Sequence, residues 1–195
     1  MKKGLLLLAL LMTTVAWSQN SNTEEKQLTK FEQIASETGR IIKFQDVKLP
    51  NVALNVTSSL TSGILKASIR LVMSNNDMFF YRLEKPETNS TIGRVAAIEY
   101  TDLVEINKAL VTLVNAVEED VAAKPDYLEN KFRTEDGLEI GYYISNSGLT
   151  PGKAVWFIKL ERYSNSTVFV KNSEEIVKRF SEAQAKIEEL RASRN

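Results

Sequence analysis

The sequence predicts an α+β domain in which helices pack mainly on one face of an antiparallel sheet. Three observations predict it: short segments of alternating apolar and polar residues, two long stretches with apolar residues at helical spacing, and a strand-rich unit of about ββββα that occurs twice. The two pseudo-repeats cover residues 40–122 and 126–193, and a further helix precedes them. We therefore expect residues 28–195 to form a single domain.

Residues 1–18 have the pattern of a secretory signal peptide. Lys2 and Lys3 precede an apolar run, and the small residues Ala16 and Ser18 suit a cleavage site before residue 19. The alternative is a retained membrane anchor, but the apolar run is too short to span a bilayer. Residues 19–27 are predicted to be a flexible leader. The short basic start favours a bacterial protein that is periplasmic or secreted, with no transmembrane anchor after cleavage.

The first elements of the domain are a short helix and a strand. Apolar residues at helical spacing predict a helix that begins near Leu28 and ends by Gly39, a residue type that often follows a helix. Residues 41–47 are predicted to form a strand that Pro50 stops.

Two hairpins follow, each with a definite predicted register. In the first, both strands alternate apolar and polar residues, and a one-residue slip would place Arg82 opposite Ile69. In the second, Gly137 is expected to adopt a left-handed conformation in the turn. The predicted partners are Leu71–Phe79, Ile69–Tyr81 and Ala67–Leu83 in the first hairpin, and Phe132–Ile140 and Leu128–Ile144 in the second.

Each pseudo-repeat ends in an amphipathic helix with a predicted capping pair. Asp102 is expected to be the N-cap of the first helix, with Glu105 completing a capping box three residues later. Asn172 and Glu175 occupy the matching positions before the second helix. Because the apolar stripes of the two helices also match, we expect the two halves to share one continuous sheet and one core.

The composition limits the chemistry. The chain has 195 residues, 25 basic and 25 acidic side chains, 43% hydrophobic residues, and neither cysteine nor histidine. This excludes histidine bases, Ser-His and Cys-His nucleophile systems, disulfides and Cys/His zinc sites. A formal net charge of +0 gives no electrostatic basis for binding nucleic acid. Because phosphate-loop, serine-nucleophile and acidic calcium-loop motifs are also lacking, we predict no catalytic, cofactor-binding or metal-binding residues.

The second face of the sheet is the tentative interaction surface. Side chains alternate between the two faces of a sheet, so every second residue of these strands points away from the core. The outward side chains include those of Phe80, Arg82, Tyr143 and Phe157, and Gly141 would permit a close approach to this face. A face this apolar is not expected to stay bare. The N-terminal helix could cover it, a second copy could cover it as a homodimer, or it could recognise a protein, a peptide or an apolar ligand.

The function predicted from these observations is an exported, non-enzymatic binding or protein-interaction domain. The first alternative is a carrier of a small apolar ligand or lipid, held between sheet and helices. The second is a carboxylate-based hydrolase, for which Glu99 and Glu161 are the candidates because both lie in predicted strands. No cofactor is expected.

Overall fold

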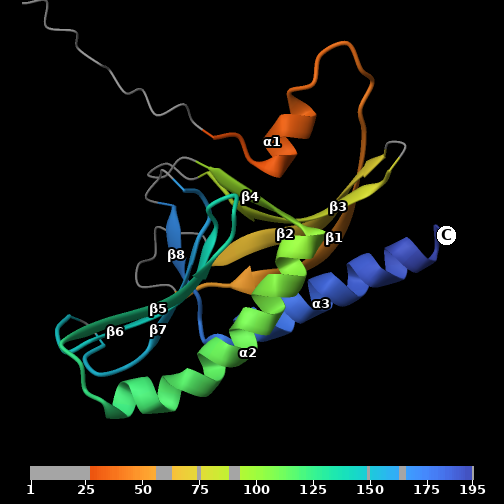
Figure 1. Ribbon diagram of the computed structural model, residues 1–195. Helices are drawn as coiled ribbons and strands as arrows, with labels where there is room; N and C mark the ends of the chain where they lie inside the picture. The colour runs from red at the N-terminus through yellow and green to blue at the C-terminus, as the bar shows by residue number, and fades with distance from the viewer. Residues whose placement is uncertain are drawn as a thin grey trace, which may run out of the picture.

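A computed structural model describes residues 27–55, 63–73, 76–87, 93–148, 150–162 and 166–194 of the chain (Figure 1). The predicted signal peptide and residues 19–26 of the predicted leader lie outside the described residues. The elements in chain order are α1 (Lys30–Ala35), β1 (Lys43–Ala53), β2 (Ile64–Met73), β3 (Met78–Lys85), β4 (Arg94–Glu99), α2 (Tyr100–Ala122), β5 (Tyr127–Arg133), β6 (Glu139–Ser145), β7 (Val155–Lys159), β8 (Thr167–Phe169) and α3 (Ser173–Ala192). The predicted N-terminal helix followed by two ββββα units is confirmed.

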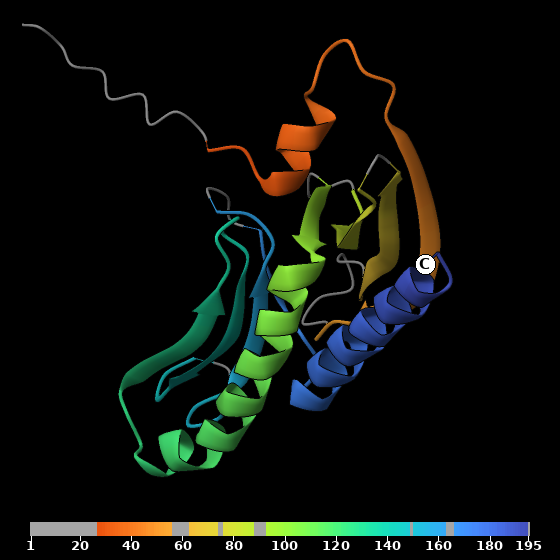
Figure 2. The ribbon, with the colours of Figure 1, turned by 45° about the vertical axis from the view of Figure 1, so that its right-hand side comes forward.

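The strands form two antiparallel sheets of four strands each, with the orders β1-β2-β3-β4 (sheet 1) and β5-β6-β7-β8 (sheet 2). The sheets meet at a seam, where a bridge joins Leu54 to Val170 and the Asn55 N–H donates to the Phe169 carbonyl oxygen over 2.8 Å. The expectation of one continuous sheet is therefore wrong. Pairing at the seam covers only the ends of β1 and β8, and the two sheets diverge from it (Figure 2).

One hydrophobic core lies between the sheets and the two long helices. Its fully buried members include Tyr81 of sheet 1, Tyr142 of sheet 2, Leu110 of α2 and Phe180 of α3. α3 packs on β1, β2 and β3, whereas α2 crosses from β3 and β4 to β5 and β6 (Figure 2). Helix α2 therefore packs against both sheets and joins them in addition to the seam. Among the described helices, none combines the length and the apolar character needed to cross a membrane.

The predicted registers of both hairpins are confirmed. All three predicted pairs of the first hairpin occur between β2 and β3, and both predicted pairs of the second occur between β5 and β6. Gly137 has a φ of +89°, so the left-handed turn residue is also correct. In each hairpin the register keeps apolar side chains on the face that meets the helices.

Strand β1 continues past its predicted end. It includes Pro50 and runs to Ala53, and its register with β2 shifts between Leu49 and Val52. Pro50 therefore lies at an irregularity of an edge strand, where the missing backbone N–H removes no regular ladder bond.

The predicted caps differ between the two long helices. Asn172 caps α3 as expected, because its side-chain oxygen accepts the Glu175 N–H at 3.0 Å. The prediction for α2 is wrong: the helix begins at Tyr100, and its N-cap Glu99 makes no side-chain cap bond. Asp102 lies in the first turn instead and accepts hydrogen bonds from Lys30, 72 positions away in the sequence.

Gly141 is required by a close approach within sheet 2. A Cβ at this position would lie 2.2 Å from the Asn130 carbonyl oxygen and 2.7 Å from the Cα of Lys131. Both atoms are backbone atoms of β5, so the approach that Gly141 permits is made by the neighbouring strand.

Candidate binding site

Helix α1 lies across the outer face of sheet 1, the face opposite the core (Figure 1). Its Phe31 ring meets the Phe80 ring edge-on, with the centroids 5.3 Å apart, and lies 5.9 Å from the Phe44 ring. The Arg70 guanidinium is 5.8 Å from the Phe31 centroid. Phe80 is fully buried as a result. The N-terminal helix thus covers Phe80, one of the two residues that sheet 1 contributes to the predicted interaction surface.

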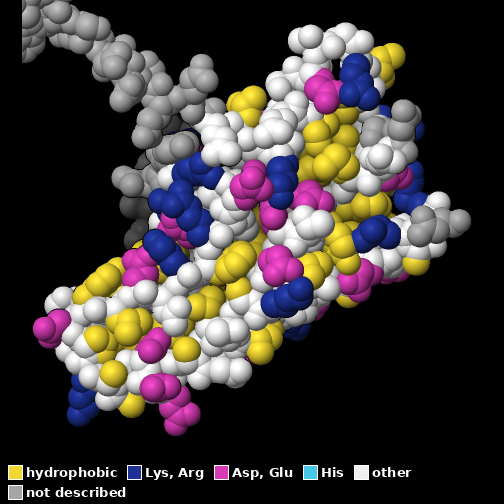
Figure 3. Space-filling view, in the orientation of Figure 1, with side chains coloured by type: hydrophobic (Ala, Val, Ile, Leu, Met, Phe, Trp, Pro, Cys, Tyr) yellow, Lys and Arg dark blue, Asp and Glu magenta, His cyan; other side chains and the backbone are white. Residues whose placement is uncertain are grey.

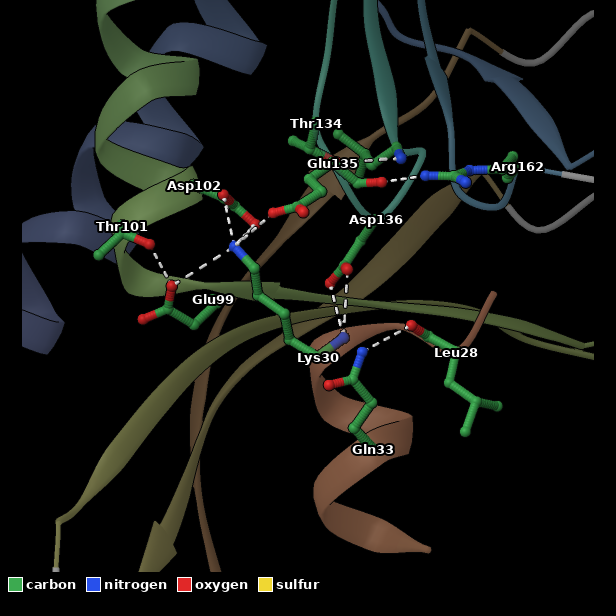
Figure 4. A network of polar contacts seen from close by, with 11 residues as sticks. Leu28, Lys30, Gln33, Glu99, Thr101, Asp102, Thr134, Glu135, Asp136 and Arg162 are labelled. Atoms are coloured by element: carbon green, nitrogen blue, oxygen red, sulfur yellow. Dashed lines mark hydrogen bonds and ion pairs between the residues drawn. The ribbon is translucent and has the colours of Figure 1, made fainter. Parts of the chain in front are cut away.

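A second contact fastens α1 through charged groups (Figure 4). The ammonium of Lys30 lies 3.0 Å from both carboxylate oxygens of Asp102 and 3.9 Å from the carboxylates of Glu99 and Glu135. The backbone N–H of Lys30 donates to both oxygens of Asp136 at 3.1 Å. We call Lys30, Glu99, Asp102, Glu135 and Asp136 the Lys30 cluster. It joins α1 to the start of α2 and to the β5–β6 turn.

The Lys30 cluster perturbs two titrating groups. Burial lowers the pKa of Lys30, but the hydrogen bond and the negative charge of Asp102 outweigh it, so the pKa lies above its ordinary value. Burial is the main cause that raises the pKa of the Asp136 carboxyl, and the nearby Asp102 carboxylate adds to it, while the Lys30 N–H opposes it. The cluster therefore favours the charged form of Lys30 and raises the free energy needed to ionise Asp136.

A cavity of about 510 Å³ opens beside this cluster. Its walls come from α1, from β4, from the β5–β6 turn and from the segment that follows β7, with a mainly apolar lining. The lining residues are Gln27, Thr29, Phe31, Glu32, Arg94, Val95, Ala96, Ala97, Ile98, Asp102, Thr134, Asp136, Leu138, Leu160, Glu161 and Arg162. Figure 3 shows side chains of both charges gathered around the junction between α1 and the turns of sheet 2.

The rim of the cavity carries paired charges. Arg94, at the start of β4, lies 3.4 Å from the Glu161 carboxylate, and both side chains are about one-third exposed. The Arg162 guanidinium donates to the Gln27 side chain and to the Glu135 carbonyl oxygen. The rim therefore offers carboxylates and guanidinium groups above an apolar floor.

The four residues of the predicted interaction surface fall into two separate groups. Phe80 and Arg82 lie on the outer face of sheet 1, where Arg82 forms an ion pair with Glu84 at 2.7 Å. Tyr143 and Phe157 lie on the outer face of sheet 2, and Phe157 is only 6% exposed. The structure does not bring the two pairs onto one face, because each belongs to a different sheet.

Sheet 2 carries an aromatic row that includes Tyr143. The Tyr143 ring stacks on Tyr127 of β5 with centroids 6.3 Å apart and meets Phe169 of β8 edge-on at 6.2 Å. Tyr127 is 61% exposed and Phe169 is 40% exposed. Neither residue is among those predicted from the sequence, although each alternates with core residues along its strand and so shares the outward direction of Tyr143.

The two candidate hydrolase carboxylates are engaged elsewhere. Glu99 belongs to the Lys30 cluster and accepts a hydrogen bond from the Thr101 hydroxyl, whereas Glu161 pairs with Arg94 across the cavity rim. Within the described ranges, no group of three or more acidic side chains is placed to hold a metal ion.

Comparisons with protein-family models, with curated proteins and with solved structures found no match to this chain. Its function must be inferred from the site itself.

The sequence reasoning also missed the cavity. Its walls are contributed by segments as far apart as Phe31, Val95 and Leu160, and no local pattern links them. The sequence indicates only one of the cavity's features, the tight turn at Glu135-Asp136-Gly137. The residue types of a turn do not show that Asp136 accepts hydrogen bonds from Lys30 of α1.

Proposed function

We propose that this protein is an exported, non-enzymatic binding domain that holds its ligand, a protein segment or a small apolar molecule, in the cavity beside α1. The cavity carries this proposal. Its volume of about 510 Å³ is typical of ligand sites, as is a lining whose accessible surface is mainly apolar and which also includes charged groups. It also lies where α1 meets both sheets, and ligand sites commonly form at such junctions.

The state of the carboxylates supports binding rather than hydrolysis. Asp102 and Asp136 both bond to Lys30, and Glu161 pairs with Arg94. Each of these carboxylates is thus already engaged in a contact within the fold. These groups fasten α1 and shape the rim.

Export is proposed from the sequence pattern of residues 1–18. Because the chain has no cysteine, the core alone must stabilise the exported domain. A core that extends over both sheets and both long helices supports such a domain without disulfides.

The cavity can be tested with N-phenyl-1-naphthylamine, a neutral apolar dye whose fluorescence rises in apolar surroundings. We expect saturable binding by the purified protein. The variant Ala97→Phe adds a ring at a half-buried position of the cavity wall and should weaken binding at least tenfold, which corresponds to about 1.4 kcal/mol. Thr167→Phe is the matched control, because it adds the same ring on the outer face of sheet 2.

Equal loss of dye binding in both variants, with unchanged circular dichroism, would place the site elsewhere and contradict the proposal. Absence of saturable dye binding would exclude a small apolar molecule as the ligand and leave only a protein segment. Native mass spectrometry of gently purified protein separates the two ligand types, because a carrier of apolar molecules should retain a bound mass that Ala97→Phe removes.

A further inference from the structure

We infer that the cavity receives an extended peptide segment of a partner protein, which adds to the free edge of β4 as a fifth strand of sheet 1. This inference rests on the proposed function, since it names the ligand class of the same cavity. Three observations carry it: the way β4 lines the cavity, its place in the sheet, and the charges at the rim.

The lining shows that β4 presents its edge to the cavity. Five consecutive residues, Arg94–Ile98, border the cavity. Side chains of successive strand residues point to opposite faces of a sheet, so one face cannot supply five in a row. The common boundary is the strand edge, which consists of backbone N–H and C=O groups.

This edge lacks a neighbouring strand in the described part of the chain. Sheet 1 ends at β4, whose register pairs it only with β3, from Lys85–Arg94 to Phe80–Glu99. A row of unpaired backbone groups is a template for another strand. Addition of an extended peptide to such an edge is a common recognition mode, in which the backbone supplies affinity and alternate side-chain pockets supply specificity.

The surroundings of the edge define the peptide that fits. Ile98, Leu138 and Leu160 belong to the core cluster and offer apolar contacts on one side of the added strand. Helix α1 and the Lys30 cluster lie at its other side, and carboxylates outnumber guanidinium groups in the lining. At about 3.3 Å per residue, Arg94–Ile98 spans about 13 Å and accommodates four or five peptide residues. The expected ligand alternates apolar residues with polar ones that include Lys or Arg.

The test begins with a random octapeptide library displayed on phage and selected on the purified protein. The selected peptides should alternate apolar and polar or basic residues. Two N-methylated versions of the best peptide are then synthesised, one methylated at the odd-numbered amides and one at the even-numbered amides. One version should have a Kd at least tenfold higher than the unmodified peptide and the other should change much less, because only one set of N–H groups faces β4.

Amide exchange followed by NMR supplies the structural readout. On peptide binding, alternate amides within Arg94–Ile98 should exchange at least tenfold more slowly, since only those directed away from β3 gain a partner. Peptides that bind without protecting these amides, or whose affinity is unaffected by N-methylation in either register, would overturn strand addition.

The two proposals fail in different ways. If the dye binds and Ala97→Phe abolishes its binding, but the library yields no peptide that protects β4, the cavity is a site for small apolar ligands and the strand-addition inference is wrong. If neither dye nor peptide binds at the cavity, both proposals are wrong.

Discussion

The variant Phe31→Ala tests how α1 is held over sheet 1. The substitution removes the ring contacts with Phe80 and Phe44 and the guanidinium contact with Arg70. An aromatic pair contributes about 0.5–1.5 kcal/mol and an exposed cation–π contact about 0.5–1 kcal/mol, so the loss should be about 3 kcal/mol. None of the α1 residues is fully buried or belongs to the core cluster. The loss should therefore detach α1 rather than unfold the domain.

Amide exchange and thermal melting together distinguish these outcomes. A loss of about 3 kcal/mol should speed exchange of the Lys30–Ala35 amides about 100-fold, while the melting temperature changes by less than about 3 °C. The control Ile34→Ala truncates a half-buried residue of the same helix without removing a ring contact and should have a smaller effect. Unchanged exchange in α1 would refute the assignment of Phe31 as the main anchor. A large drop in melting temperature would show that α1 is part of the cooperative core.

Three further predictions concern stability. Gly141→Ala should destabilise the protein by about 3 kcal/mol and lower the melting temperature by about 6–12 °C, because the new Cβ would overlap the backbone of β5. The control Gly93→Ala should change the melting temperature little, because the nearest atom to the new Cβ is 3.3 Å away. Tyr81→Phe should raise the melting temperature by about 2–4 °C, since its buried hydroxyl has no hydrogen-bond partner in the described residues, and a lower value would contradict this. Burial, followed by the Asp120 hydrogen bond, raises the pKa of Tyr142 to about 12. Because the unfolded chain loses this proton first, stability should fall as pH rises from about 10 to about 12, and less steeply in Tyr142→Phe.

The hairpin registers could be predicted from the sequence because they depend on nearby residues. A slip of one residue would exchange the core face with the outer face, so the alternation around Ile69 and Tyr81 leaves one acceptable pairing. The turn at Gly137 and the cap at Asn172 are local in the same sense. Each prediction is confirmed for that reason.

The wrong predictions involve residues that meet over long sequence distances. Asp102 has the residue type of an N-cap, but Lys30 provides a charged partner at 3.0 Å, and the sequence around Asp102 does not reveal it. The break between the sheets likewise depends on how α2 crosses from one to the other. The cavity depends on the position of α1, which Lys30 and Asp102 help to hold, and on the separation of the two sheets. Neither arrangement can be predicted from local sequence, so the cavity cannot be predicted from it either.

The most direct test of the central claim is chemical-shift mapping of the isotope-labelled protein with the selected peptide or, failing one, with the dye. The largest changes should cluster on Phe31, Val95 and Leu160, which line the cavity from three separate segments. Changes confined to the aromatic row of Tyr127, Tyr143 and Phe169 would contradict that claim, because they would place recognition on the outer face of sheet 2.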